Sequence, residues 1–448
     1  FGTRSCSRSS PTKASAPRSL AELFLPVDAS SQWWYVAGFP KKSDNMTRQD
    51  DMLRTAKQVQ LGNDAPAPFV LTEGRGRRVT DMSGREYLDL SGGISVLSVG
   101  HSHPTLTAAI AEQAGRLMHV SNIFYNDRAI ELAESICART AFDKVYFCNS
   151  GSEANESLLK LARRYHYDRG DTERVDFVAT NNSFHGRTMG SLSLTGQPKY
   201  HKGMEPLIQG VRFIDFNDLA ALDAAVDEHT AAVLFEPLQA EGGIIVGTPE
   251  FVEGARRICD ERGALLFFDE IQTGYGRTGT FLAHEHFGVA PDACSLAKGI
   301  GGGFPLGAIA VTDRVAPGLP PGSHASTFGG NPLACAAGLA VLQIMDEEGL
   351  VHNARVQGEH LAAALRSMDA RLATTAGTRG LGLLQGIVLA EDVDPAATIA
   401  AVHGAGLLLT LAGGNVVRIS PSLNVTRDEL DEGLAILERV LAETPRKP

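Results

Sequence analysis

The change of hydrophobic period between residues 100 and 326 constrains the fold of this chain more than any other feature. Short apolar runs are separated there by amphipathic stretches with helical spacing. Parallel strands need crossover connections of this kind, which cover both faces of a sheet with helices. The pattern therefore predicts an α/β fold with a mainly parallel sheet. The expected strands are residues 144–149 (KVYFCN), 175–180 (VDFVAT), 232–236 (AVLFE), 264–268 (ALLFF) and 308–311 (AIAV).

The flanking segments predict a second, smaller α/β domain. Short strands and turns precede residue 90, with Gly84 in a hairpin-like turn. After Asn331 a long helical stretch leads into a mixed region that ends in another helix. We therefore predict a large domain at residues 96–330, inserted between two parts of a smaller domain at residues 46–95 and 331–448. Helices inside the large domain are expected at residues 154–167, 219–228 and 249–261.

Composition narrows the possible partners. The 448 residues carry a formal net charge of -11, which argues against nucleic acid or an anionic membrane surface as a partner. No apolar run approaches the roughly 20 residues of a membrane-spanning helix. The six cysteines show no CxxC motif and no metal-ligand spacing, so we expect no metal site. Reduced cysteines favour a cytoplasmic location, with an organellar matrix as the alternative.

The first 45 residues are expected to lie outside the fold. They are rich in serine and arginine and contain no acidic residue before Glu22. Such a composition is typical of an organellar transit peptide. The alternative is an extension upstream of a start at Met46, and the enzyme-like stretch MTRQDDMLRTAKQVQ favours it.

The segment between residues 265 and 298 carries the strongest chemical signal. The apolar run LLFF ends on Asp269 and Glu270, and the next apolar stretch ends on Lys298, which precedes the glycine-rich GIGGGFPLGA. Each residue taken alone indicates a solvated strand end or a helix N-cap. A carboxylate and a lysine at neighbouring strand ends suit pyridoxal 5'-phosphate (PLP), because the lysine forms a Schiff base and the acid holds the pyridinium proton.

Other motifs could complete such a site. Gly151 and Ser152 open a helix after a strand, where exposed amides form an anion site or where a serine simply caps the helix. Phe184 could stack on a flat ring and Arg187 could bind a carboxylate, although core and surface roles are the common alternatives. Arg418 lies inside an apolar strand, so it should have a charged partner or an anionic ligand.

Taken in chain order, these motifs resemble the class III (subgroup II) aminotransferases, which are PLP-dependent enzymes of fold type I. The resemblance covers residues 68–441 and implies a large domain with a mainly parallel seven-stranded sheet. It also implies amino-acid and 2-oxo-acid substrates. The matching stretches are NSGSEANE, FHGRT, EPLQAEGG, FFDEIQTGYGRTG, LAKGIGGGFPLGA, STFGGNPLA and VRISPSL.

The resemblance assigns a role to each cofactor-binding position. Lys298 would form the Schiff base and then move the proton on the substrate, Asp269 would pair with the pyridinium nitrogen, and Gln272 would contact the ring hydroxyl. Thr327 would reach the phosphate in the neighbouring subunit, which implies a homodimer with shared active sites. The remaining contacts with the phosphate and the ring fall to Gly151, Ser152 and Phe184.

Substrate selection is carried over in the same way. Arg418 would bind the α-carboxylate of 2-oxoglutarate or glutamate, and Glu241 would pair with it when the long amine donor is bound. Arg187 would hold the distal carboxylate of the donor. Ile94 stands where ornithine-specific members have a tyrosine, and Ala240 replaces a more usual glycine beside Glu241.

The resemblance favours N2-acetylornithine as amine donor and 2-oxoglutarate as acceptor, in arginine biosynthesis. An alternative is an aminotransferase for 4-aminobutyrate, another ω-amino acid or a diamine. A catalytically inactive binding protein on the same fold is the remote alternative.

Overall fold

The computed structural model describes residues 47–446, so the expected extension at residues 1–45 lies outside the described residues. The chain divides into two compact units, with the boundary between Val59 and Gln60. Within the first unit the structure describes helix α1 (Arg48–Val59), which has no buried side chain. None of the described helices is both long enough and apolar enough to cross a membrane.

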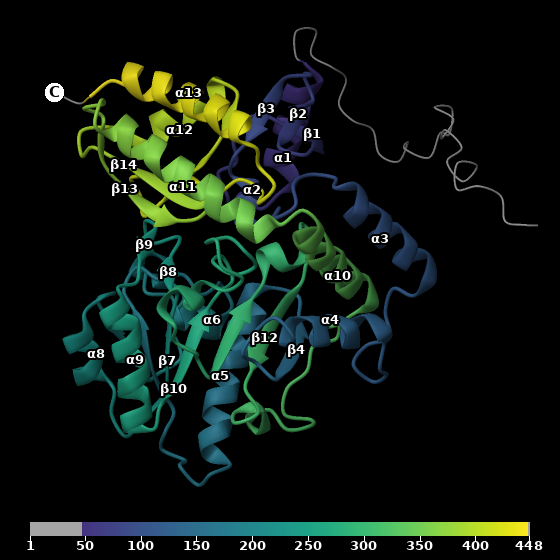
Figure 1. Cartoon of the computed structure of the whole chain (residues 1–448), viewed down its shortest axis with the longest axis vertical. Coiled ribbons are helices and arrows are strands. Elements are labelled where there is room, and N and C mark those ends of the chain that lie inside the picture. Colours follow the sequence, from purple (N-terminus) through teal and green to yellow (C-terminus); the bar gives the residue numbers. More distant parts are fainter. Residues whose placement is uncertain (1–46, 447–448) are drawn as a thin grey trace, which may run out of the picture. The chain divides into compact units, whose positions relative to one another are not determined.

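A seven-stranded sheet forms the centre of the second unit, as predicted (Figure 1). Only β12 runs against its neighbours, since it pairs antiparallel with both β11 and β4, whereas the other neighbouring strands pair in parallel. In spatial order the strands are β4 (Lys144–Cys148), β12 (Gly307–Val311), β11 (Ala293–Leu296), β10 (Leu265–Asp269), β7 (Thr230–Phe235), β5 (Asp176–Thr180) and β6 (Val211–Ile214).

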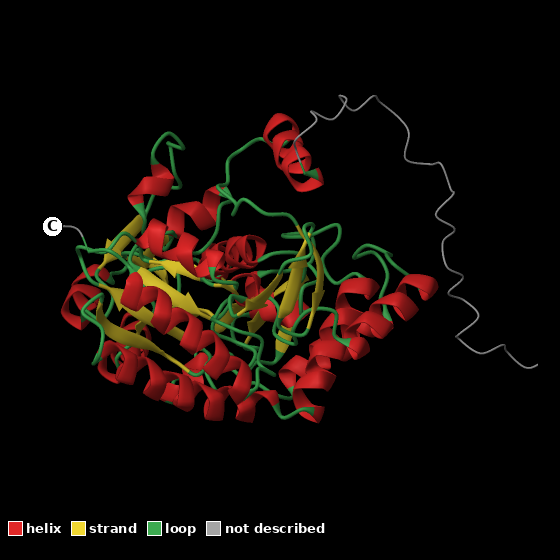
Figure 2. Cartoon of the chain, turned by 90° about the horizontal axis from the view of Figure 1, so that it is seen from above, coloured by secondary structure: helices red, strands yellow, loops and turns green. Residues whose placement is uncertain are grey.

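Strand β10 shows why this sheet needs helices on both faces. All five of its residues are buried. Leu265 and Phe267 belong to the apolar cluster that includes helix α5 (Gly151–Tyr167), whereas Leu266 and Phe268 belong to the cluster that includes helix α9 (Pro249–Arg262). Successive strand side chains point to opposite faces, so an uninterrupted apolar run must be covered twice. Figure 2 shows helices on both sides of the strands.

Two helix boundaries differ from the prediction by more than one residue. Helix α5 begins at Gly151 rather than at Ala154, because the Ser150 side chain accepts a hydrogen bond from the Glu153 amide and caps the helix. Helix α8 (Leu219–Ala225) ends before the predicted residue 228. There the Asp227 carboxylate is held by the Arg212 guanidinium, which fixes a turn in place of a further helical turn.

Strands from both ends of the second unit lie side by side (Figure 1). The first four-stranded sheet contains β1 (Leu71–Arg75), β2 (Arg78–Asp81), β3 (Glu86–Asp89) and β15 (Leu407–Leu408). The second contains β13 (Thr375–Leu381), β14 (Leu384–Leu389), β17 (Val416–Ile419) and β16 (Thr410–Ala412). The first sheet thus joins the segments that were assigned to one smaller domain. The domain boundaries at residues 95 and 330 themselves stay a prediction.

The remaining elements complete the second unit. The further helices are α2 (Gly92–Ser95), α3 (Pro104–Arg116), α4 (Asp127–Cys137), α6 (Met189–Leu194), α7 (Pro198–His201), α10 (Pro332–Glu347), α11 (Leu350–Asp369), α12 (Pro395–Gly404) and α13 (Arg427–Glu443). The 3-10 helices are η2 (Ala283–Phe287), η3 (Lys298–Gly301) and η4 (Ala316–Gly318). A short two-stranded sheet joins β8 (Leu238–Gln239) to β9 (Ile245–Val246). The five cysteines between residues 47 and 446 are free thiols.

Candidate active site

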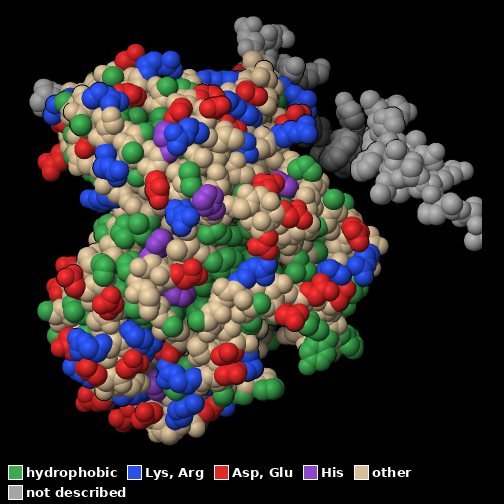
Figure 3. All heavy atoms as spheres, in the orientation of Figure 1, with side chains coloured by type: hydrophobic (Ala, Val, Ile, Leu, Met, Phe, Trp, Pro, Cys, Tyr) green, Lys and Arg blue, Asp and Glu red, His purple; other side chains and the backbone are tan. Residues whose placement is uncertain are grey.

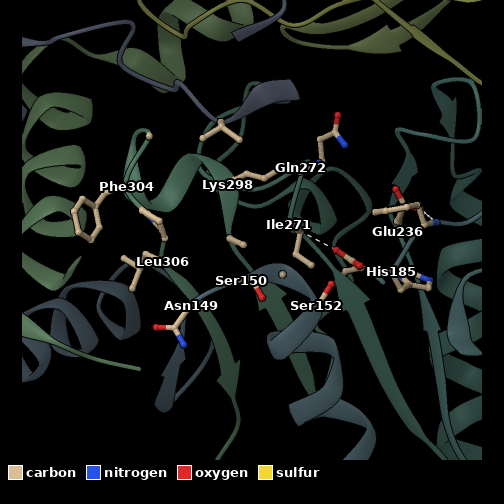
Figure 4. A pocket seen from close by; sticks show the side chains of 18 residues that line it. Asn149, Ser150, Ser152, His185, Glu236, Ile271, Gln272, Lys298, Phe304 and Leu306 are labelled. Atoms are coloured by element: carbon tan, nitrogen blue, oxygen red, sulfur yellow. Dashed lines mark hydrogen bonds and ion pairs between the residues drawn. The ribbon is translucent and has the colours of Figure 1, made fainter. Parts of the chain in front are cut away.

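A cavity of about 370 Å³ lies at the carboxyl ends of the central strands. Parallel strands bring their carboxyl ends to one edge of a sheet, where ligands bind in α/β folds. In Figure 4, Lys298 reaches in from one side, Glu236 and His185 lie opposite, and Ser150 and Ser152 mark the start of helix α5. The cavity is also lined by Asn149, Gly151, Phe184, Asp269, Gln272 and Phe304.

Lys298 presents a free amine to this cavity. It begins helix η3 with a φ of 50°, in the left-handed region that non-glycine residues seldom adopt. Its amine forms no hydrogen bond or ion pair with another described residue. Burial lowers the pKa of Lys298 to about 8, against the opposing charge of Glu241. About a tenth of the amine is therefore neutral at pH 7, far more than for a solvated lysine.

Asp269 is held by three donors at the end of β10. One carboxylate oxygen accepts a hydrogen bond from the Ile271 amide at 3.0 Å, drawn as a dashed line in Figure 4. The other accepts from Asn155 Nδ2 at 2.8 Å and from His185 Nδ1 at 2.7 Å. Because a carboxylate can only accept, Nδ1 of His185 carries the proton. The residue is 3% exposed, so the position of the carboxylate is fixed.

His185 and Asn155 were given no role from the sequence. They lie within the motifs FHGRT and NSGSEANE, but nothing local indicates that they meet the same carboxylate. Both also retain a buried polar atom without a hydrogen-bond partner among the described residues, His185 Nε2 and Asn155 Oδ1. Unsatisfied buried polar atoms are rare and are typical of functional sites.

The start of helix α5 lines the cavity with Gly151 and Ser152, whose backbone amides suit an anion. A Cβ atom on Gly151 would lie 2.7 Å from Ile271 Cδ1, so a larger residue there would force the Ile271 side chain to shift. A Cβ atom on Gly186 would lie 2.2 Å from Ser152 Oγ. The free amides of the first helical turn carry the positive end of the helix dipole and suit a phosphate group.

Arg418 has the charged partner that the sequence required. Its side chain is 1% exposed within β17, and its guanidinium forms an ion pair with the Glu241 carboxylate. Gln272 joins both groups, since its oxygen accepts from Arg418 Nη1 at 3.0 Å and its amide donates to Glu241 Oε1 at 3.1 Å. Burial alone would raise the pKa of Glu241, but the positive charges of Arg418 and Lys298 outweigh it and the pKa is lowered.

Glu236 is a further acidic residue of the site, and the sequence by itself assigned it no role. Its carboxylate follows β7, is 4% exposed and lines the cavity. One oxygen accepts from the Phe184 amide and the other from the Ala240 amide, both at 3.0 Å. Burial raises the pKa of Glu236 to about 7. The unusual methyl group of Ala240 packs in an apolar cluster with Leu238 and Ile244.

Five predicted residues lie outside the lining of this cavity, and two of them, Glu241 and Arg418, contact the lining residue Gln272. Ile94 has a φ of 63° and is 42% exposed. Thr327 lines a separate cavity of about 390 Å³ together with Ser326 and Phe328, so a single chain does not bring it to Lys298. Arg187 is exposed beside the ring of Phe184. The predicted roles of these residues, like those of the cavity residues, stay predictions.

The donor set of the cavity fits PLP. The start of helix α5 offers an anion site, Asp269 offers a fixed carboxylate and Lys298 offers an unpaired amine. Phe184 lines the same cavity with an aromatic ring. These are the groups that a phosphorylated pyridine aldehyde requires.

Comparisons with known proteins agree with the assignment of the cavity to PLP. The family model for aminotransferase class-III matches residues 60–441. An acetylornithine aminotransferase from Neisseria meningitidis is 47% identical over 383 residues, which cover 85% of this chain and 96% of the relative. The solved ornithine aminotransferase from Toxoplasma gondii, which holds PLP at partial occupancy, has a TM-score of 0.85 at 34% identity and covers 88% of this chain and 94% of its own.

A second solved structure supports the same assignment. The N-acetylornithine aminotransferase from Stenotrophomonas maltophilia is 36% identical with a TM-score of 0.76, and the match covers 87% of this chain and 98% of that one. The chain therefore belongs to the class-III aminotransferase family.

Proposed function

We propose that this enzyme transfers the terminal amino group of N2-acetylornithine to 2-oxoglutarate, giving the semialdehyde and glutamate, in arginine biosynthesis. The observation that carries the proposal is the ion pair of the buried Arg418 with the partly buried Glu241, beside the Lys298 cavity. The names of the relatives from Neisseria meningitidis and Stenotrophomonas maltophilia support this choice of donor.

Class-III aminotransferases are PLP-dependent, and the cavity residues fit that cofactor. When bound, PLP supplies an electron sink for the bond that breaks at the amine-bearing carbon of the substrate. Lys298 Nζ, neutral in part near pH 7, would take the proton from that carbon and deliver it to the aldehyde-derived carbon of the cofactor. Asp269, held by Asn155 and His185, would hold a negative charge against the ring nitrogen of the cofactor.

The ion pair solves a problem of two substrates in one site. The reacting carbon of glutamate bears a carboxylate, whereas the terminal carbon of N2-acetylornithine bears none. Arg418 is buried, so leaving it without a negative partner is costly. Glu241 neutralises Arg418 while the long donor is bound and moves aside when a substrate carboxylate takes its place.

A screen of the first half-reaction tests the donor. The PLP form is mixed with N2-acetylornithine, ornithine, 4-aminobutyrate or putrescine, and the loss of the cofactor's visible absorbance is followed. We expect the highest kcat/KM for N2-acetylornithine. A higher value for 4-aminobutyrate or putrescine would favour the alternative aminotransferases, and no reaction with any donor would favour a binding protein.

We propose further that the enzyme is a homodimer with shared active sites. An apolar patch, visible in Figure 3 near the loop between α3 and α4, supports this proposal. His119 in that loop lies 5.2 Å, between ring centroids, from Phe328, the neighbour of Thr327. Exposed apolar surface of this kind marks an association site. The patch consists of Met118, Ile123, Phe124, Tyr125 and Phe328.

Mixing two damaged subunits tests whether the site is shared. Lys298→Ala and Thr327→Ala homodimers should both be impaired. A dimer with one subunit of each kind has one site with both residues intact, provided that Thr327 serves the partner. We expect mixing after partial unfolding and refolding to restore activity. If the mixture stays as inactive as its components, Thr327 acts within its own subunit or has no role in the site.

A further inference from the structure

The aromatic ring of Tyr200 lies under the guanidinium of Arg187. The Cζ atom of Arg187 is 3.8 Å from the centroid of the Tyr200 ring and 5.4 Å from that of the Phe184 ring. The two rings meet edge to face, with centroids 6.1 Å apart and planes at 84°. The guanidinium is therefore held between a ring that lines the Lys298 cavity and a ring outside that cavity.

No carboxylate holds Arg187. Among residues 47–446, no acidic side chain forms a salt bridge with Arg187, although most other arginines there have such a partner. A cation stacked on a ring face keeps its full charge, whereas a salt bridge would neutralise it. The edge of the guanidinium also keeps its N–H groups available for a bidentate ligand. A stacked and unpaired arginine is thus ready to bind an anion.

Tyr200 stands on a firmly anchored support. It belongs to the short helix α7, and the next residue, His201, has its Nε2 atom 2.7 Å from the Thr195 carbonyl and 3.1 Å from the Leu192 carbonyl. The Tyr200 amide donates to the Gln197 carbonyl at 2.9 Å. The other member of the stack is anchored as well, since the Arg187 backbone amide donates to Ser152 Oγ at 3.1 Å. Both partners of the stack are therefore tied to the backbone around the cavity.

We propose that Tyr200 is a positioning residue for donor specificity, because its ring orients the Arg187 guanidinium toward the carboxylate of the amine donor. The inference rests on the proposed function only in assigning that carboxylate to N2-acetylornithine. Tyr200 touches neither the reacting carbon nor the cofactor cavity, so its contribution is confined to donors that carry a carboxylate.

Two donors that differ only in that carboxylate test the proposal. N-acetylputrescine has the acylated chain and the terminal amine of N2-acetylornithine but lacks its carboxylate. We expect Tyr200→Leu to raise KM for N2-acetylornithine about tenfold and to leave KM for N-acetylputrescine and kcat unchanged. Tyr200→Phe keeps the ring and should behave as the wild type. Equal changes for both donors, or no change for either, would overturn the proposal.

Two further variants guard against a trivial result. In the Arg187→Met background, Tyr200→Leu should have no additional effect on KM for N2-acetylornithine, since the group that it positions is gone. Lys199→Met removes the other cation near the ring, whose Nζ lies 4.8 Å from the centroid, and should leave KM unchanged. A loss of discrimination in Lys199→Met would move the carboxylate site to Lys199 and overturn the role of Tyr200.

A binding measurement separates this inference from the proposed function. N-acetylnorvaline has the carboxylate and the acyl group of N2-acetylornithine but no terminal amine, so it binds without reacting. Its Kd, measured calorimetrically on the PLP-loaded enzyme, should rise about tenfold in Tyr200→Leu and not in Tyr200→Phe. An unreactive wild type would contradict the proposed donor alone. An unchanged Kd in Tyr200→Leu would contradict the role of Tyr200 whatever the donor.

Discussion

The buried guanidinium of Arg418 and the carboxylate of Glu241 form an ion pair in which Gln272 contacts both members. The two charged residues are far apart in the chain, one after β7 and the other in β17, and they meet beside the cavity that holds Lys298. Lys298 and Arg418 together lower the pKa of Glu241 against the effect of its burial. The positive charge of Arg418 beside the cavity is therefore neutralised only while Glu241 contacts it.

Replacement of Glu241 should change the balance between the two half-reactions. Glu241→Gln removes the negative charge that neutralises Arg418. A substrate whose reacting carbon bears a carboxylate should then bind more tightly than one without it. We expect the ratio of the rate with glutamate to the rate with N2-acetylornithine to rise at least about tenfold, a change of roughly 1.4 kcal/mol. Single-turnover kinetics measure both rates. Glu253→Gln, an exposed change on α9, is the matched control, and an unchanged ratio in Glu241→Gln would argue against the switch.

The reactivity of Lys298 should depend on pH with a midpoint near its lowered pKa. Only the neutral amine attacks an aldehyde, and burial lowers the pKa of Lys298 to about 8 from 10.5. In cofactor-free enzyme, the rate of covalent PLP capture should rise with pH and level off above about 8. Borohydride reduction followed by mass spectrometry measures capture, and Lys298→Ala should show none. A midpoint near 10.5 would mean that burial does not perturb the amine.

Asp269 should be needed as a charge rather than as a hydrogen-bond acceptor. Asp269→Asn keeps the shape but cannot hold a proton on the ring nitrogen, so the first half-reaction should slow about a hundredfold or more. Asp269→Glu keeps the charge at a shifted position and should lose less. Stopped-flow absorbance gives the rate, and cofactor content is measured in parallel. A normal rate for Asp269→Asn at full cofactor content would contradict the assignment.

Glu236 should make the stability of the enzyme fall with rising pH. Burial raises the pKa of Glu236 to about 7 from 4.5, so between these values the unfolded chain loses the proton before the folded protein does. The contribution of Glu236 to stability is therefore largest below about pH 4.5, declines up to about pH 7 and is constant above. The unfolding temperature of Glu236→Gln should decline less over this window than that of the wild type. Parallel curves would show that Glu236 does not titrate there.

Charged residues in the apolar patch should separate the subunits. Phe124 and Tyr125 are 67% and 96% exposed, and the double variant Phe124→Asp/Tyr125→Asp places two charges in a surface that we expect a second copy to cover. Analytical ultracentrifugation should show a monomer, and an activity assay should show that this monomer has little activity. Tyr167→Asp, a change at another exposed tyrosine, is the control and should leave the dimer intact. A dimeric double variant would place the interface elsewhere.

Local patterns were sufficient for most strands of the central sheet and for several site residues, whereas the seven-stranded sheet followed from the resemblance to a family. The apolar run of β10 predicted a strand buried on both faces, because its side chains alternate between two apolar clusters. A charge inside the apolar strand that became β17 predicted that Arg418 has a charged partner, because burial of an unpaired charge is costly. Helix ends were predicted less well, since a single capping side chain such as Ser150 decides at which residue a helix begins.

Contacts between distant segments could not be predicted in this way. Nothing near Asp269 indicates that Asn155 and His185 bind it, and nothing near Arg187 indicates the ring of Tyr200. That Glu241 is the charged partner of Arg418 followed only from the resemblance to a family, and not from any spacing in the chain.

The sequence by itself determined the α/β class, the apolar strands and the residue types that suit PLP, because these depend on period and composition along short stretches. Only the tertiary structure decided which groups hold each carboxylate, and that the pKa of Glu236 is raised whereas that of Glu241 is lowered. Two backbone amides hold Glu236, and Arg418 and Gln272 hold Glu241. Asp269 is held by His185, Asn155 and the Ile271 amide. Desolvation and charge act through space, so the same residue type acquires a different chemistry at each position.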